Sequence, residues 1–191
     1  MKADAKNCVG AILGDGWYAG YIGFRLLVGM PRPRNYYEGE PRLRAQIEIE
    51  YADGTTERVV TNADWKATYG PIREADNLMG ETEDFRLDLG PWSTPGYDAA
   101  KWQPVATGPD PKIAVQAHPG LPVRKHETFP AKSVKEIKPG VFIYDLGQNL
   151  VGYARVTVHG HAGDKVQLRF AERLQDNGEM YTINYRKARC I

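Results

Sequence analysis

The amino-acid sequence predicts an all-β protein built from two consecutive antiparallel β-sandwich units. Two stretches carry alternating apolar and polar residues on both sides of a turn, residues 43–61 and residues 153–171. Alternation with a period of two is typical of half-buried strands, and a glycine-containing turn between two such segments indicates a hairpin. Apolar residues at helical spacing are almost absent, so we expect few helices.

The first hairpin is predicted over residues 43–61. From Leu43 to Tyr51 every second residue is apolar, in the order LRAQIEIEY. Asp53-Gly54 follows, a dipeptide that accepts the backbone twist of a tight antiparallel turn. Residues 55–61 are rich in threonine and valine and form the return strand. One face of this hairpin is therefore expected to pack and the other to meet water.

The second hairpin is predicted over residues 153–159 and 165–171, whose apolar side chains alternate with charged or polar ones. Gly160 and Gly163 permit the positive φ angles of a hairpin loop, and Asp176-Asn177-Gly178 supplies similar turn chemistry after the second strand.

Other parts of the chain carry weaker signals. Further strands are predicted within residues 7–13, 21–28, 85–89 and 141–146. One or two helical turns are predicted around residues 97–102, after Pro95-Gly96. There we expect Asp98 to cap the turn and Trp102 to have a structural role against a sheet.

A domain boundary is predicted where proline and glycine concentrate. Residues 1–106 form the first sandwich, residues 107–122 a Pro/Gly-rich linker, and residues 123–191 the first part of a second sandwich. The second unit has about four strands, which is few for two covered faces. The first unit begins with a strand close to Met1. We therefore expect a fragment, truncated at both ends.

Charge and cysteine content exclude several classes of protein. The 25 basic and 24 acidic residues give a formal charge of +1, so neither nucleic acid nor an anionic membrane is an expected partner. No apolar run is long enough to span a bilayer, and residues 1–6 lack the apolar core of a signal peptide. Cys8 and Cys190 lie near opposite ends of the chain, and no disulfide framework or metal-binding cysteine pair is expected. The compartment stays open.

Several blocks of sequence in a fixed order resemble one enzyme family. The segments LGDGWYAG at 13–20, GPIREADN at 70–77 and GYDAAKW at 96–102 resemble the N-terminal β-sandwich of bacterial α-L-rhamnosidases. The segments from residue 144 to 152 and from 171 to 186 resemble the concanavalin-like sandwich that follows in the same enzymes. The resemblance covers nearly the whole chain and implies jelly-roll or lectin-like sandwiches.

The resemblance also implies a function for the parent protein. It implies an inverting glycoside hydrolase that removes terminal α-L-rhamnose by carboxylates in an (α/α)6 barrel downstream of these sandwiches. The chain itself is expected to be inactive. The acidic pairs Glu81 with Asp84 and Glu172 with Asp176 are candidates for paired acid–base catalysis, but acids are mostly solvated surface groups. No catalytic residue is assigned.

Carbohydrate binding is a stronger hypothesis for this chain than catalysis. Asp15, Trp17 and Tyr18 place a carboxylate and two aromatic rings between glycines, a combination that stacks on a sugar and accepts hydrogen bonds from its hydroxyl groups. The alternative is that Trp17 and Tyr18 pack in the core, with the glycines allowing close approach.

A calcium site is a second hypothesis. Asp76, Asn77, Glu81 and Asp84 gather hard oxygen donors in and beside a loop, which suits Ca²⁺. In the family that the sequence resembles, some N-terminal modules bind rhamnose through calcium. The alternative is a solvated acidic turn, because the spacing of a known calcium loop is absent. No cofactor is required by either interpretation.

Two further groups are interpreted as structural. Asp145, Gln148 and Asn149 follow a buried strand and are expected to satisfy backbone groups at a corner of the chain. The arginines and tyrosines within residues 32–42 are interpreted as a long loop on the rim of the first sandwich.

Two classes of function follow. The first is a non-catalytic accessory region of an α-L-rhamnosidase, which supports the downstream barrel in cis and binds rhamnose-containing glycans. The second is a free-standing carbohydrate-binding or structural β-sandwich protein. A reading frame that continues into helical repeats favours the first class.

Overall fold

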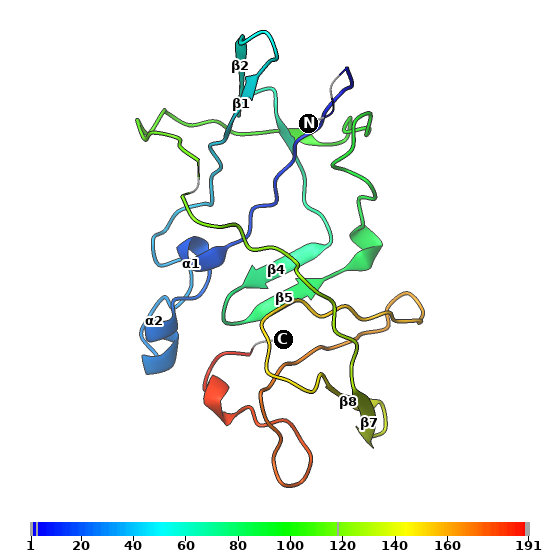
Figure 1. Ribbon diagram of the computed structural model, residues 1–191. Helices are drawn as coiled ribbons and strands as arrows, with labels where there is room; N and C mark the ends of the chain where they lie inside the picture. The colour runs from blue at the N-terminus through cyan, green and yellow to red at the C-terminus, as the bar shows by residue number, and fades with distance from the viewer. Residues whose placement is uncertain (1, 3, 118, 190–191) are drawn as a thin grey trace. The chain divides into compact units, whose positions relative to one another are not determined.

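The computed structural model describes residue 2, residues 4–117 and residues 119–189. The chain divides into two units, Met1–Ala117 and His118–Ile191 (Figure 1). Strands outnumber helices, and every named strand pair among the described residues is antiparallel. The predicted all-β class is confirmed. Each sheet consists of two strands, in the pairs β1-β2, β3-β6, β4-β5 and β7-β8.

The first predicted hairpin is confirmed. Strand β1 (Gln46–Glu50) pairs with β2 (Thr56–Val60), and Gln46 lies opposite Val60. The turn between them places Gly54 at φ +82°, where residues with a Cβ are disfavoured. The side chain of Asp53 accepts a hydrogen bond from the backbone N–H of Thr55 at 2.9 Å, as turn-forming aspartates do.

Two other strand pairs of the first unit were not predicted. Strand β4 (Ile72–Asp76) pairs with β5 (Gly80–Glu83) across a turn at residues 77–79, and Asp76 lies opposite Gly80. The short strands β3 (Lys66–Ala67) and β6 (Gln103–Pro104) pair over a long sequence separation. Charged residues in READ and GETE hide the alternation, because both faces of the β4-β5 hairpin carry polar side chains.

The predicted strand at residues 21–28 is wrong. The chain forms α1 (Gly16–Ala19) and then α2 (Gly23–Val28), which is drawn below α1 in Figure 1. Helix α2 contains the good helix formers Arg25, Leu26 and Leu27 and ends at Gly29. Gly29 has φ +70°, and its N–H donates to the carbonyl of Arg25. A glycine cap of this kind commonly ends a helix and therefore favours a helix over a strand here.

Three other local predictions for the first unit are wrong. Residues 7–13 have no ladder partner and are irregular, so the apolar run alone does not make a strand. Residues 85–89 begin with a 3-10 helix, η1 (Phe85–Leu87), because Asp84 caps it by accepting from the N–H of Arg86 at 3.1 Å. Residues 97–102 form turns and no helix, although the Asp98 side chain does accept from the N–H of Ala100 at 2.9 Å.

The second unit contains the hairpin of β7 (Ser133–Lys138) and β8 (Val141–Asp145) and a 3-10 helix, η2 (Ile183–Tyr185). The strand predicted at 141–146 is confirmed, whereas β7 was not predicted. The hairpin predicted over residues 153–171 is wrong for the described residues, since only its turn forms, with the N–H of Asp164 donating to His161 O at 3.0 Å. Nothing described covers its apolar face, and an uncovered hairpin is marginal in water.

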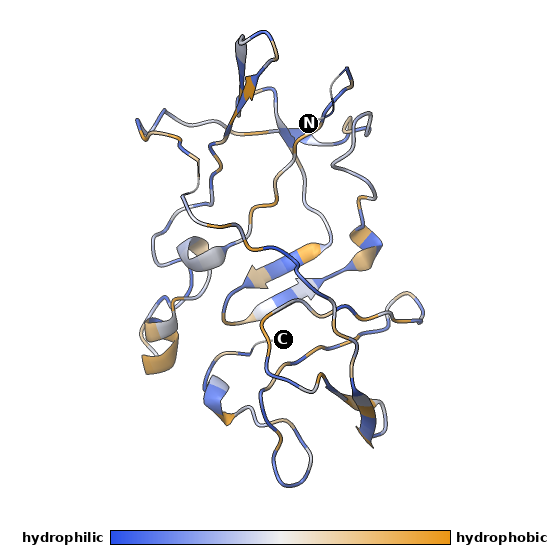
Figure 2. Cartoon of the chain, viewed as in Figure 1, coloured by the Kyte–Doolittle hydropathy of each residue, from blue (hydrophilic) through white to orange (hydrophobic). Residues whose placement is uncertain are grey.

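Among the described residues, most large apolar side chains are exposed to solvent. Ala19 is the one hydrophobic residue among them that is buried, with 8% of its area exposed. Figure 2 shows hydrophobic segments along α2, β1 and β4. Cys8 is exposed, and Cys190 lies outside the described residues. Among the described helices, none combines the length and the apolar character needed to cross a bilayer.

Candidate functional site

The predicted sugar-binding segment begins with Asp15, which precedes α1. Its carboxylate pairs with the guanidinium of Arg34 at 2.5 Å (Asp15 Oδ2 to Arg34 Nη2). The hydrogen bond that Arg34 donates to Asp15 and the attraction of the Asp15 charge raise the pKa of Arg34. One carboxylate oxygen is therefore already occupied, and Asp15 ties the first turn of α1 to the loop that follows α2.

The two aromatic residues of α1 are not buried. Trp17 and Tyr18 expose 55% and 48% of their area. Tyr18 stacks on Tyr37, with ring centroids 5.6 Å apart and planes 6° from parallel. Tyr36 meets Tyr37 edge-on at 5.2 Å. The core-packing alternative for Trp17 and Tyr18 is thus wrong for the described residues, and Tyr18 belongs to a group of three exposed rings.

Asp76 joins this region to the β4-β5 hairpin. Its Oδ1 accepts hydrogen bonds from the backbone N–H groups of Leu78 and Met79, at 2.8 and 2.9 Å. Its Oδ2 accepts from the N–H of Tyr21 at 2.7 Å. The turn after β4 and the end of α1 are therefore held by one carboxylate, which satisfies N–H groups that would otherwise need water.

The predicted calcium ligands do not converge. Asp76 and Asn77 lie at the turn of the β4-β5 hairpin, whereas Asp84 follows the far end of β5. Four residues of extended strand separate such ends by about 13 Å, far more than the span of one calcium shell with ligands at 2.3–2.6 Å. Within the described residues, no three His, Cys, Asp or Glu side chains group around a potential metal position. The four residues therefore do not fit one ion together.

The acids of β5 have other partners. Asp84 receives two hydrogen bonds from the guanidinium of Arg86, at 2.8 and 2.6 Å, and this pairing lowers the pKa of Asp84 to about 2. Partial burial, together with the hydrogen bond and the negative charge of Glu81, raises the pKa of Glu83. Glu81 and Asp84 are thus engaged with different neighbours.

The corner after β8 is built by Asp145. Its side chain accepts from the N–H of Gly147 at 2.7 Å, and its carbonyl accepts from the N–H of Lys132 at 2.7 Å. Gly147 has φ +74°, and the side chain of Lys132 lies against it. Gln148 and Asn149 follow on the exposed side of the corner. This geometry supports the structural interpretation of Asp145.

Trp102 lies in a second aromatic group. Its ring is 6.3 Å from that of Trp92 and 5.8 Å from that of Tyr97, with the Tyr97 ring edge-on. All three side chains are half-buried. The group holds the irregular segment 91–102 together and supports the predicted structural role of Trp102.

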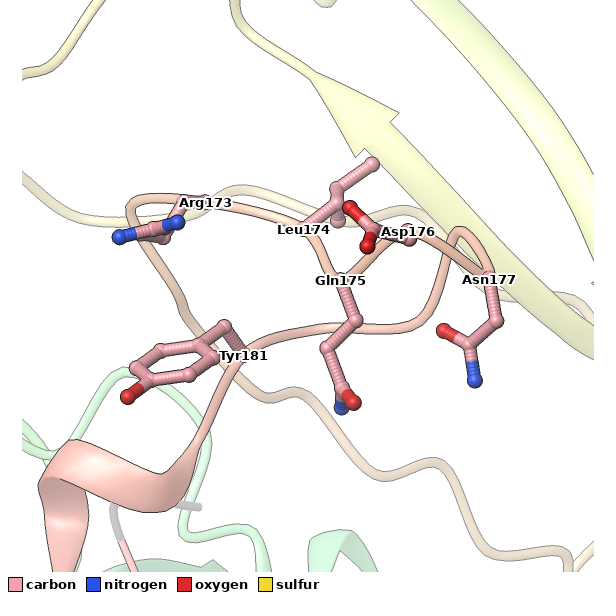
Figure 3. A pocket seen from close by; sticks show the side chains of 6 residues that line it. All are labelled: Arg173, Leu174, Gln175, Asp176, Asn177 and Tyr181. Atoms are coloured by element: carbon pink, nitrogen blue, oxygen red, sulfur yellow. The ribbon is translucent and has the colours of Figure 1, made fainter.

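A shallow hollow of about 450 Å³ lies in the second unit, where residues 173–177 approach Tyr181 (Figure 3). The guanidinium of Arg173 lies 5.2 Å from the ring centroid of Tyr181, and Gln175 donates to the carbonyl of Met180 at 3.0 Å. Figure 3 shows Asp176 on the opposite side of the turn from Gln175. The polar groups that line the hollow do not point toward a common position, so they do not surround a single ligand. It includes Asp176, one of the acids considered for catalysis.

The sequence analysis did not predict that Tyr36 and Tyr37 form ring contacts beside Tyr18. The signal was a pair of adjacent tyrosines in a loop with two prolines and two arginines. That loop lies against α1, since the N–H of Asn35 donates to Ala19 O and the N–H of Ile22 donates to Pro33 O. Backbone contacts of this kind cannot be read from residue types alone.

Comparisons with known families match both units. Residues 1–127 match the α-L-rhamnosidase N-terminal domain, and residues 135–191 match the bacterial α-L-rhamnosidase concanavalin-like domain. The first match runs past the predicted linker.

Individual relatives give the same result. An α-L-rhamnosidase of Streptomyces avermitilis is 47% identical over 184 residues, and one of Alteromonas sp. is 40% identical; each match covers 95% of this chain, but only 17% and 19% of those proteins. The crystal structure of the S. avermitilis enzyme with L-rhamnose superimposes with a TM-score of 0.75 at 45% identity, over 92% of this chain and 16% of that one. The Aspergillus terreus enzyme gives 0.73 at 30% identity, over 93% and 20%. The chain therefore spans less than a quarter of the length of these relatives.

Proposed function

The chain belongs to the α-L-rhamnosidase family, and we propose that it serves as a non-catalytic accessory region of such an enzyme. The parent activity proposed is the hydrolysis of terminal α-L-rhamnose by a catalytic (α/α)6 domain further along the same polypeptide. The accessory region supports that domain by offering it an apolar surface. The chain matches a short part of much longer relatives, which supports an accessory role for this region and catalysis by another part of the protein.

The observation that carries the proposal is the exposure of the faces that the sequence marks as inward. Five side chains that alternate along residues 153–171 all lie at the surface: Val156, Val158, Val166, Leu168 and Phe170. Covering side chains of this kind contributes about 1.5–3 kcal/mol each. Large exposed apolar patches are typical of surfaces that other protein covers. The rest of the parent enzyme is the covering partner that we propose.

Substitution on this face tests the accessory role. Phe170→Asp is expected to leave the melting temperature of the 191-residue chain unchanged, because Phe170 is already exposed. In a polypeptide that continues along the reading frame, the same change is expected to lower the melting temperature and the yield of rhamnosidase activity. Gln167→Asp, which changes an exposed polar residue of the same segment, is the matched control. Equal effects of Phe170→Asp in both proteins would contradict the proposal.

The absence of catalysis in this chain has a direct test. The 191-residue chain is expected to release no L-rhamnose from an aryl α-L-rhamnoside above the rate of a blank. Measurable turnover would overturn the non-catalytic assignment. A stop codon directly after residue 191 would favour a free-standing β-sandwich protein instead.

Rhamnose binding is proposed for the segment of Asp15, Trp17 and Tyr18. The exposed rings of Trp17 and Tyr18 support it. A crystal structure of a 45% identical relative in complex with L-rhamnose supports it as well. A calcium contribution is proposed for the Asp76–Asn77 turn alone, since Asp84 is paired with Arg86. Calorimetric titration with L-rhamnose, with and without Ca²⁺, tests both. Binding that chelation does not weaken would remove the calcium contribution.

A further inference from the structure

We propose that Asn177 is a modification site, where deamidation in water converts the side-chain amide into a carboxylate. The inference goes beyond the accessory role and does not depend on it, because it concerns a turn at residues 173–181 of the second unit. Asn177 is the one asparagine of the chain that is followed by glycine. The others are followed by Cys8, Tyr36, Ala63, Leu78, Leu150 and Tyr185.

The reaction needs only the chain and water. A base removes the proton from the backbone nitrogen of Gly178, and this nitrogen forms a bond to Cγ of Asn177. The bond from Cγ to Nδ2 breaks, and the departing nitrogen takes up a proton from water and leaves as ammonia. A five-membered cyclic imide remains. Water then adds to one of its two carbonyl carbons and breaks the C–N bond, which gives aspartate or isoaspartate.

The side chain of Asn177 is held in a position that assists the attack. Its Oδ1 accepts a hydrogen bond from the N–H of Glu179 at 3.0 Å. A donor at this oxygen stabilises the negative charge that develops there while the new bond forms. Asn177 is exposed, and Figure 3 shows it at the opposite end of the loop from Tyr181. Water and base therefore reach the amide directly.

The attacking nitrogen belongs to a residue without a side chain. Gly178 has φ +82°, and the place where a Cβ would lie has no atom within 4 Å. The N–H of Gly178 donates to the carbonyl of Gln175 at 2.9 Å, so this hydrogen bond has to open before the nitrogen attacks. Exposed turns open locally at a low cost in free energy. The reaction is therefore expected to be slow in the folded chain and to follow the opening of the turn.

Asn62 provides a matched comparison within the same chain. Its Oδ1 accepts from the N–H of Asp64 at 3.0 Å, and its Nδ2 donates to Oδ2 of Asp64 at 2.9 Å. Asn177 has the same two hydrogen bonds with Glu179, and both asparagines are exposed. The residue after Asn62 is Ala63, whose methyl group crowds the backbone nitrogen that would attack. We therefore expect Asn62 to keep its amide under conditions in which Asn177 loses it.

The modification places a new charge beside an ion pair of the second unit. Glu179 pairs with Lys138 of β7, and Nδ2 of Asn177 lies 3.3 Å from Oε2 of Glu179. A carboxylate at position 177 is therefore next to a like charge. Isoaspartate also adds a carbon to the backbone of a turn in which the N–H of Gln175 donates to Glu179 O at 2.7 Å. Modification is thus expected to loosen the contact between this turn and β7.

The experiment follows the intact 191-residue chain during incubation in mildly alkaline buffer. Samples are digested in mildly acidic buffer, and mass spectrometry compares the peptides that contain Asn177 and Asn62 with those of an unincubated sample. Asn177 is expected to gain the mass of an amide-to-acid change, with isoaspartate as the larger product, while Asn62 does not change. The rate is expected to rise with pH, because the nitrogen of Gly178 must lose its proton.

Two variants test the mechanism. Gly178→Ala is expected to slow the mass gain at Asn177 at least tenfold, and circular dichroism checks that the variant folds at this positive φ. Asn177→Gln keeps the glycine and is expected to show no measurable gain, because its imide would need a six-membered ring. An unchanged Asn177 in the wild type, equal gains at Asn177 and Asn62, or a gain in Asn177→Gln as fast as in the wild type would each overturn the proposal.

Discussion

The carboxylate of Asp76 accepts a hydrogen bond from the backbone N–H of Tyr21 at 2.7 Å, across 55 residues of sequence. The same side chain also accepts from the N–H groups of Leu78 and Met79. One side chain thereby fixes both a hairpin turn and the segment that carries α1. The half-buried position of Asp76 strengthens its role, since N–H groups there have less access to water.

Asp76→Ala is expected to lower the free energy of unfolding by about 1–3 kcal/mol, because several N–H groups lose their acceptor. Urea denaturation followed by circular dichroism measures it. Asp88→Ala is the control, since the Asp88 side chain accepts from the nearby N–H of Gly90 in an exposed turn. A loss no greater than that of the control would show that Asp76 does not hold the two segments together.

Gly20→Ala is expected to weaken the hydrogen bond between the N–H of Tyr21 and the carboxylate of Asp76 and so to destabilise the first unit. A Cβ at this position would collide with the carbonyl oxygen of Gly16 and with Oδ2 of Asp76, and backbone atoms cannot move aside cheaply. The expected cost is about 1–3 kcal/mol. Gly14→Ala is a matched control, because its nearest atom would be the Cβ of Ala75 at 3.9 Å, an ordinary contact. Thermal melts of both variants provide the comparison, and equal melting temperatures would refute the close approach.

Asp84 is expected to titrate in the folded chain with a pKa of about 2, below its ordinary value of 3.8, chiefly because Arg86 hydrogen-bonds the carboxylate. A lowered folded pKa contributes stability above the unfolded pKa, and that stability is lost as the pH falls from about 4 toward 2. The pair is exposed, so salt is expected to weaken the effect. NMR titration of the Asp84 side chain measures the midpoint, and Arg86→Gln is expected to move it upward. An unchanged midpoint in Arg86→Gln would contradict the assignment.

Trp102→Ala is expected to destabilise the first unit by about 1–3 kcal/mol, because the contacts with Trp92 and Tyr97 are both lost. Near-ultraviolet circular dichroism is expected to lose part of its aromatic signal at the same time. Tyr69→Ala, which removes a ring that is almost fully exposed, serves as the control for both measurements. A Trp102 variant as stable as that control would exclude a structural role for this ring.

The sequence was sufficient where local chemistry decides the structure. The hairpin of β1 and β2 follows from strict alternation around Asp53-Gly54, and its turn has the expected hydrogen bond from Thr55 to Asp53. Strand β8 was likewise predicted. Alternation failed at residues 153–171, because a strand also needs a paired partner and a covered face, and the described residues supply neither.

Long-range contacts set the limit at the candidate site. Trp17 and Tyr18 were found from residue type, but the stacking of Tyr18 on Tyr37 depends on how the loop after α2 returns to α1. The proposed calcium donors were close in sequence, yet the antiparallel pairing of β4 with β5 carries Asp84 away from Asp76. Helix α2 was missed because its apolar residues also suit a strand, and the cap at Gly29 was the distinguishing signal.

The separation of 55 residues between Asp76 and Tyr21 also bears on the order of folding. Closing a long loop costs more chain entropy than closing the three-residue turn of the β4-β5 hairpin. The hairpin is thus expected to form first and to present the Asp76 carboxylate to an N-terminal segment that joins later. Pulsed hydrogen exchange during refolding measures this order, because the amide of Tyr21 becomes protected only on joining. Protection of Tyr21 ahead of the β4-β5 amides would reverse it.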